Sequence, residues 1–84
     1  MDKLPLTELE FKINHLYEII SEQTNLLLFY KSKNEEQKEL NLPIYKQMNY
    51  ESAIKVTEIN LIEYKKQLNT LEKYKNEGYY ILDK

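Results

Sequence analysis

Residues 6–30 read LTELEFKINHLYEIISEQTNLLLFY, with an apolar side chain at nearly every third or fourth position. Residues 50–71, which read YESAIKVTEINLIEYKKQLNTL, have the same spacing. Steps of three and four place side chains on one stripe of an α-helix, and a repeat held over three or more heptads is typical of a coiled coil. The stripes comprise Leu6, Leu9, Ile13, Leu16, Ile20, Gln23, Leu27 and Tyr30 in the first stretch, and Tyr50, Ile54, Thr57, Leu61, Tyr64, Leu68 and Leu71 in the second. The sequence therefore predicts an all-α fold, an antiparallel two-helix hairpin in a single domain, residues 1–84.

Local signals predict where the first helix begins and ends. Thr7 and Glu10 have the spacing of a capping box, and Leu6 and Phe11 have the spacing of the accompanying hydrophobic staple. Pro43 disfavours helical geometry in the residue before it. We therefore expect the first helix over about 8–39, followed by a turn at 40–43.

The second helix has two possible starts. A start at about residue 44, behind Pro43, keeps the neighbouring apolar residues at helical spacing and is favoured. The alternative makes Asn49 the N-cap and Tyr50 the first helical residue. In either case Gly78 is the expected C-cap, so the helix is predicted over about 44–77 and nearly matches the first in length.

A short tail, residues 78–84, follows the second helix and contains strand-favouring residues. The candidate docking residues in it are Tyr79, Tyr80, Ile81 and Leu82. The favoured interpretation is that the tail folds back on the Leu4 and Leu6 end of the hairpin. The alternative is that it adds to a sheet or groove of a partner.

Composition narrows the class of protein. The 84 residues include no cysteine, 14 acidic residues and 12 basic residues, all of them lysine, for a net charge of −2. Without arginine and with this charge, binding to duplex nucleic acid is not expected. The longest apolar run, residues 26–30, is too short to span a membrane. We expect a cytoplasmic protein, and the abundance of Lys, Asn and Ile is typical of AT-rich coding sequences, as in a low-GC bacterium or its phages.

Several apolar residues fall outside the two stripes. They are Leu28, Phe29, Tyr45, Met48, Ile59 and Ile62. One hairpin cannot bury a second apolar side, and such surface usually marks an interface. Because two hairpins make a four-helix bundle, the sequence predicts a homo-oligomer, with a dimer favoured, and these six residues as the interface with itself or with a host protein.

Residues suited to catalysis or metal binding are scarce. His15 is the only histidine, and its register places it on the outer side of the first helix. The serines have no neighbouring base, and Gly78, the only glycine, cannot form a phosphate-binding loop. We therefore expect no catalytic residue, metal or cofactor, and no enzymatic activity.

The tyrosines allow a second hypothesis. The residues concerned are Tyr30, Tyr50 and Tyr64, with the nearby lysines Lys31, Lys33 and Lys46. The favoured interpretation is that the tyrosines form polar layers that set the helix register. The alternative is a crevice in which an aromatic ligand such as a nucleotide stacks, with lysine meeting phosphate.

The sequence thus favours a small protein-protein interaction module, and a phage-encoded or mobile-element-encoded inhibitor of a host protein is the specific form we expect. The alternative is an oligomeric helical protein that binds or sequesters a nucleotide.

Overall fold

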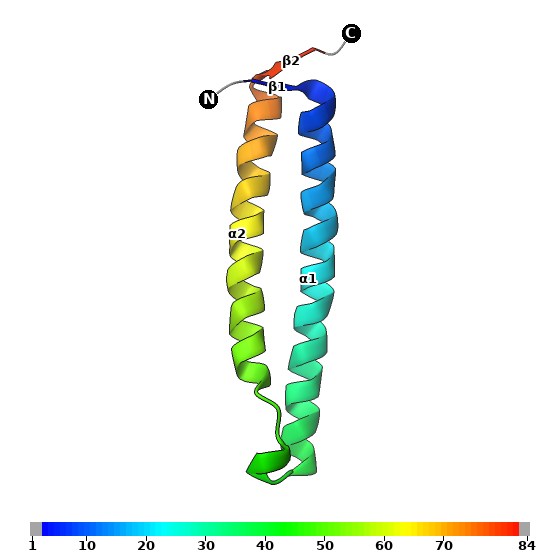
Figure 1. Ribbon diagram of the computed structural model, residues 1–84, viewed down its shortest axis with the longest axis vertical. Helices are drawn as coiled ribbons and strands as arrows, with labels where there is room; N and C mark the ends of the chain where they lie inside the picture. The colour runs from blue at the N-terminus through cyan, green and yellow to red at the C-terminus, as the bar shows by residue number, and fades with distance from the viewer. Residues whose placement is uncertain (1–2, 83–84) are drawn as a thin grey trace.

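The protein is a long antiparallel helical hairpin whose two terminal segments meet at one end (Figure 1). The computed structural model describes residues 3–82, except for the side chain of Tyr45. Along the chain lie β1 (Leu4–Pro5), α1 (Leu6–Leu40), the 3-10 turn η1 (Ile44–Lys46), α2 (Tyr50–Asn76) and β2 (Tyr80–Ile81). The molecule measures 61 × 19 × 17 Å. The predicted all-α hairpin is confirmed.

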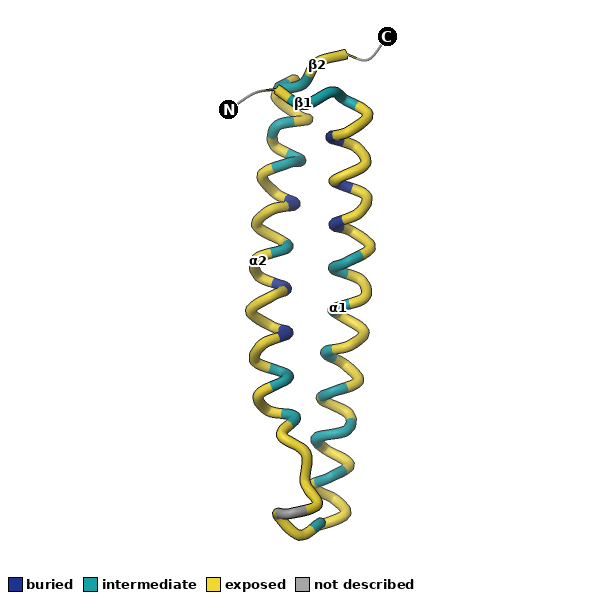
Figure 2. The backbone as a smooth tube through the Cα atoms, viewed as in Figure 1, coloured by how far each residue is buried: buried dark blue, intermediate teal, exposed yellow. Residues whose placement is uncertain are grey.

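The two predicted stripes form the seam between the helices. Its buried side chains are Leu9, Ile13 and Leu16 on α1, and Thr57, Leu61 and Leu68 on α2. Figure 2 shows the buried positions on the inner sides of both helices. Leu9, Ile13, Leu16 and Leu68 form one cluster, so the tightest packing lies in the half of the hairpin near the termini. The Thr57 hydroxyl donates a hydrogen bond to the Ala53 carbonyl at 2.8 Å, so its burial leaves no polar group unpaired.

The start of α1 differs from the prediction. The helix begins at Leu6, its N-cap is Pro5, and no side chain caps that position. The predicted capping box of Thr7 and Glu10 is therefore wrong, because Thr7 already lies inside the helix. Pro5 has φ −58° and ψ 144°, an extended geometry suited to its place in β1, so strand pairing sets the point at which the chain enters the helix.

The hydrophobic staple is also shifted by two residues. With Pro5 as N-cap, the flanking residue before the cap is Leu4, and the fourth helical residue is Leu9. Leu9 is fully buried, and Leu4 packs against the cluster to which it belongs. Phe11, which the sequence pairs with Leu6 in the staple, is 70% exposed and so does not form a buried contact there. The staple position therefore belongs to the core residue Leu9.

The favoured start of the second helix at residue 44 is wrong, and the alternative is correct. Only Ile44–Lys46 form a turn of 3-10 helix, after which Gln47 is extended with ψ 139°. Asn49 is the N-cap of α2, and its side chain accepts a hydrogen bond from the Ser52 N–H at 3.1 Å. The helices consequently differ in length, with 35 residues in α1 and 27 in α2.

Glycine ends α2 as predicted. Gly78 has φ +73°, a left-handed conformation that glycine adopts without a Cβ clash. Its N–H donates to the Lys75 carbonyl, and the Tyr79 N–H donates to the Tyr74 carbonyl at 2.8 Å. These two bonds form a Schellman motif, and the rings of Tyr74 and Tyr79 supply its apolar contact at 5.3 Å between centroids.

The C-terminal segment folds back on the start of α1. β2 pairs in parallel with β1, with Leu4 opposite Tyr80 and Pro5 opposite Ile81. Tyr80 packs against the core cluster. The tail therefore folds back on the start of α1, as the favoured interpretation predicts. Residues 83–84 of the tail lie outside the described part. The hairpin is thus closed by a turn at one end and by strand pairing at the other.

Candidate interaction surfaces

The described residues do not assemble a site for metal chemistry. Within residues 3–82, no group of three or more histidine or acidic side chains is placed to hold a metal ion. His15 lies at the surface and stacks on Phe11, with ring centroids 6.3 Å apart. In the same part of the chain, neither helix combines the length and apolar character needed to cross a membrane.

Exposed apolar side chains dominate the surface of the described chain. Thirteen large hydrophobic residues are exposed, whereas five are buried. Single exposed hydrophobic residues are common in soluble proteins, so what matters is whether these residues lie together. Their positions in the heptad repeat decide this question.

One side of α1 carries a line of residues spaced by seven: Lys12, Ile19, Leu26, Lys33 and Leu40. Seven residues make almost two turns, so the line follows one side of the helix. Lys12 borders a groove near the termini, and Lys33 and Leu40 border a hollow near the turn. We call this side of the hairpin the groove face.

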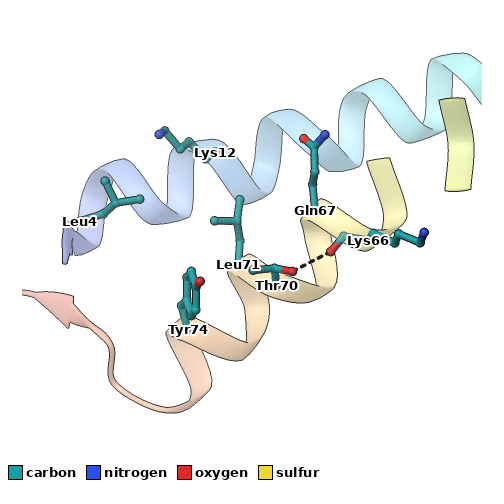
Figure 3. Close-up of a pocket in the computed structure, with 7 residues that line it drawn as sticks. All are labelled: Leu4, Lys12, Lys66, Gln67, Thr70, Leu71 and Tyr74. Carbon is teal, nitrogen blue, oxygen red and sulfur yellow. Dashed lines mark hydrogen bonds between the residues drawn. The ribbon is translucent and has the colours of Figure 1, made fainter. Parts of the chain in front are cut away.

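The groove at the terminal end has a volume of about 550 Å³ (Figure 3). Its lining residues are Leu4, Lys12, Lys66, Gln67, Thr70, Leu71 and Tyr74. Leu4 comes from β1, Lys12 from α1 and the other five from α2, so the groove exists only because the helices and the strand pair are assembled. Leu4, Leu71 and Tyr74 all pack against the core cluster. The groove therefore combines apolar side chains continuous with the core and lysines from both helices.

The middle of the groove face is apolar. Glu10 lies 3.7 Å from Lys75, and Gln37 bonds to Met48, which together fix the register of the helices. In this register Phe29 on α1 and Val56 on α2 occupy the same height along the long axis. They are 52% and 54% exposed.

Two further lines of residues place Phe29 and Val56 on the groove face. His15, Glu22, Phe29 and Glu36 are spaced by seven, as are Val56, Glu63 and Thr70. His15 borders a hollow beside the groove, Glu36 borders the hollow at the turn, and Thr70 lines the groove itself. With Leu26, which is 36% exposed, Phe29 and Val56 form the central patch.

The turn end of the groove face bears Leu40 and Met48, which we call the tip. Both side chains are exposed, at 62% and 64%, and both border the same hollow. Lys33 and Glu36 lie beside them and form an ion pair at 3.2 Å. Ile44 is also exposed and borders a neighbouring hollow with Asn34 and Lys38, which Met48 lines as well.

The six residues predicted as one interface do not share a surface. Phe29 and Met48 lie on the groove face. Leu28 and Ile62 lie on the opposite flank. Leu28 is fourteen residues after Asn14, and Ile62 is fourteen residues before Asn76, and both asparagines line a hollow on that flank. Ile59 is 61% exposed and lies midway between the buried residues Thr57 and Leu61, which places it on the outer side of α2. The side chain of Tyr45 is outside the described part.

The opposite flank contains a polar contact between the helices. The Tyr17 hydroxyl donates a hydrogen bond to a carboxylate oxygen of Glu72. This bond raises the pKa of Tyr17 above its ordinary value of 10.0, with smaller contributions from desolvation and from the negative charge of Glu72. The flank is thus already bridged within one chain.

The predicted tyrosine crevice is divided as well. Tyr30 and Tyr50 approach each other, with ring centroids 6.2 Å apart, but Tyr64 packs against the core cluster further along the hairpin. Tyr50, Lys33 and Lys46 border the hollow at the turn, whose volume is about 190 Å³. Small-molecule sites usually enclose about 300 Å³ or more.

Lys31 does not join the tyrosines. It is exposed and lies on the flank of Tyr17, from which it is spaced by fourteen residues. The structure therefore brings together Tyr30, Tyr50, Lys33 and Lys46, and leaves Tyr64 and Lys31 apart from them.

The tail residues are partly engaged within the chain. Tyr79 stacks on Tyr74, and the Lys3 ammonium lies 5.5 Å from the centre of the Tyr79 ring. Tyr80 covers the core cluster, whereas Ile81 and Leu82 are exposed. Docking of Ile81 and Leu82 to a partner stays a prediction.

Sequence reasoning missed Leu26, Val56 and the groove. Leu26 lies fourteen residues, or two heptads, after Lys12, and Val56 lies fourteen residues before Thr70. This spacing is the sequence signal that identifies their face. The groove depends on β1, which the sequence did not predict. Comparisons of the chain with family models, with curated proteins and with solved structures found no match.

Proposed function

We propose that this protein is a non-enzymatic interaction module that pairs with a second copy of itself through the groove face and forms a four-helix bundle. The observation that carries the proposal is the central patch of Leu26, Phe29 and Val56, which lies on the same face as the groove. Apolar side chains from two helices at one height are the arrangement that helix-on-helix packing requires.

Energetics supports association through this face. Removing the exposed part of each side chain from water is worth on the order of 1 kcal/mol, and a symmetric dimer counts each residue twice. A chain of 84 residues has a small core, and a stability of 5–15 kcal/mol is typical of whole domains. The free energy gained by burying the central patch and the tip in a dimer is therefore significant beside the stability of the whole chain.

The test compares two neighbouring substitutions by light scattering after size exclusion. Phe29→Glu places a charge on the groove face, and Leu28→Glu places the same charge on the opposite flank. Both side chains are exposed, so neither substitution disturbs the seam. We expect a dimeric parent, a dimeric Leu28→Glu variant and a monomeric Phe29→Glu variant.

A monomeric parent at every concentration would reject the proposal. A dimer disrupted by Leu28→Glu and not by Phe29→Glu would place the interface on the other flank and would also reject it. Circular dichroism of each variant checks that the helices are retained.

The more specific role is inhibition of a host protein in the bacterial cytoplasm by a phage-encoded chain. It extends the proposal, because a surface that pairs with a second copy can also pair with a host helix of similar shape. Capture from a bacterial lysate, with Phe29→Glu as the control bait, tests this role. A partner retained by the parent and lost by the variant is the expected result.

A further inference from the structure

We propose that the second copy binds end for end, so that the tip of each chain, Leu40 and Met48, fills the terminal groove of the other. This arrangement rests on the proposed self-association and adds to it the direction of the pair and the occupant of the groove. Three features of the groove face support it: the position of the central patch, the pattern of charges and the chemistry of the two ends.

The central patch lies midway between the groove and the tip. Consider a two-fold axis that is perpendicular to the helices and passes at the height midway between Leu26 and Phe29. This axis places α1 of the second copy on α1 of the first, and the two helices run in opposite directions. Leu26 then faces Phe29 of the second copy, and Phe29 faces its Leu26. The same axis brings Leu40 to the height of His15 and Thr70 of the second copy, because each lies about 19 Å from the axis at 1.5 Å per residue.

Charges on the groove face favour this direction. The axis between Leu26 and Phe29 also places Glu22 opposite Lys33 of the second copy, and symmetry repeats the pair. A second copy that runs in the same direction instead stacks α1 on α2 at equal heights, which places Glu22 opposite Glu63. Opposite charges therefore meet in one arrangement and like charges in the other.

The two ends match in chemistry. The groove offers Leu4, Leu71 and Tyr74 as apolar contacts. The tip offers Leu40 and Met48, which protrude on the same face with more than half of their surface exposed. Without a second copy neither the groove nor the tip is covered by the described chain. In the end-for-end pair each groove receives one tip, so all four apolar ends are buried together.

Variants with a single introduced cysteine test the arrangement. The chain contains no native cysteine, so no other thiol can react. Lys12→Cys labels the groove, and Leu40→Cys labels the tip, both on the same line of α1. Within one chain these positions are 28 residues apart, or about 42 Å, so they cannot join to each other. The two variants are purified separately, mixed, allowed to exchange and treated with a short thiol-reactive cross-linker.

We expect a cross-linked dimer in the mixture of Lys12→Cys with Leu40→Cys, and none with either variant alone. Lys12→Cys mixed with Leu28→Cys, on the opposite flank, is the matched control and should also give none. A dimer by light scattering that cross-links only through single variants, or not at all, would overturn the end-for-end arrangement while leaving the proposed self-association intact. A monomer by light scattering would overturn both.

Discussion

The side-chain amide of Gln37 pairs with both backbone polar groups of Met48. Its Nε2 donates to the Met48 carbonyl at 3.0 Å, and its Oε1 accepts from the Met48 N–H at 2.7 Å. Gln37 thereby gives the Met48 N–H an acceptor and adds a second donor to the Met48 carbonyl, which also accepts from the Tyr50 N–H at 2.9 Å. These two bonds tie the segment between η1 and α2 to α1.

Replacing Gln37 with alanine should release this segment. Each bond is exposed to solvent, so we expect a loss of about 1 kcal/mol in the free energy of unfolding. Hydrogen exchange at the Met48 amide should become faster, because its acceptor is removed. Lys38→Ala, on the next residue of the same helix, is the control and should leave the Met48 amide protected.

Leu9→Ala should be among the most destabilising single substitutions in the chain. Leu9 is fully buried at the centre of the core cluster, and truncating a buried leucine costs about 2–5 kcal/mol. Ile44→Ala is the matched control because Ile44 is 88% exposed, and its effect should be near zero. Urea unfolding followed by circular dichroism, at one protein concentration, measures both. Equal midpoints for the two variants would contradict the core described above.

Gly78→Ala should destabilise the end of α2 by about 1 kcal/mol, the approximate cost of a left-handed conformation for a residue with a Cβ. No neighbouring atom lies within 4 Å of that Cβ, so the cost comes from the backbone and not from a clash. Gly78→Asn should cost less, because asparagine tolerates this conformation better than alanine does. Thermal unfolding ranks the three proteins, and an alanine variant as stable as the parent would contradict the assignment.

The bond between Tyr17 and Glu72 should make stability depend on alkaline pH. Because the pKa of Tyr17 is raised in the folded state, the folded state keeps the phenol proton more tightly than the unfolded state does. This contribution is fully present below pH 10, the ordinary pKa, and is lost as the pH rises through the folded value. Tyr17→Phe removes the bond, so its unfolding midpoint should fall less than that of the parent above pH 10.

A tyrosine-selective NMR titration provides the direct check. In the parent, Tyr17 should titrate at higher pH than in Glu72→Gln, where the charge and the acceptor are both changed. Identical Tyr17 titrations in the two proteins would argue against the bond.

The hairpin could be predicted because its information is local and repeated. Each apolar step of three or four supports the same helix, and the buried positions Leu9, Ile13 and Leu68 all fall on the predicted stripes. Gly78 was equally predictable, since one residue type serves its conformation best. These features depend on neighbours within a few residues in the chain.

The predicted start of the first helix and the favoured start of the second were wrong because both starts depend on distant residues. Pro5 becomes an N-cap only when β1 pairs with β2, whose residues lie 76 positions away. Residue 44 fails as a helix start because Gln37, on the other helix, bonds to Met48. Helix propensity near Pro5 could not reveal the pairing of β1 with β2, and helix propensity near Pro43 could not reveal the bond between Gln37 and Met48.

The predicted interface residues stay a prediction, but their exposure and their sides of the helices can be compared with the sequence. Excess apolar residues were correctly expected outside the seam, but Leu28 and Phe29 are neighbours in sequence and lie on opposite flanks. The heptad spacing gives the side of each helix, and the register between the helices, set by contacts such as Glu10 with Lys75, gives the height at which residues of α1 and α2 meet.

The parallel pairing of β1 with β2 has a mechanical consequence. The chain enters β1 before Leu4 and leaves β2 after Ile81, so a pull on the two chain ends acts at opposite ends of the strand pair. The load is then shared by the strand bonds as shear, and they must break together before the helices can part. The strand pair thus acts as a latch that must open before the helical seam bears the load.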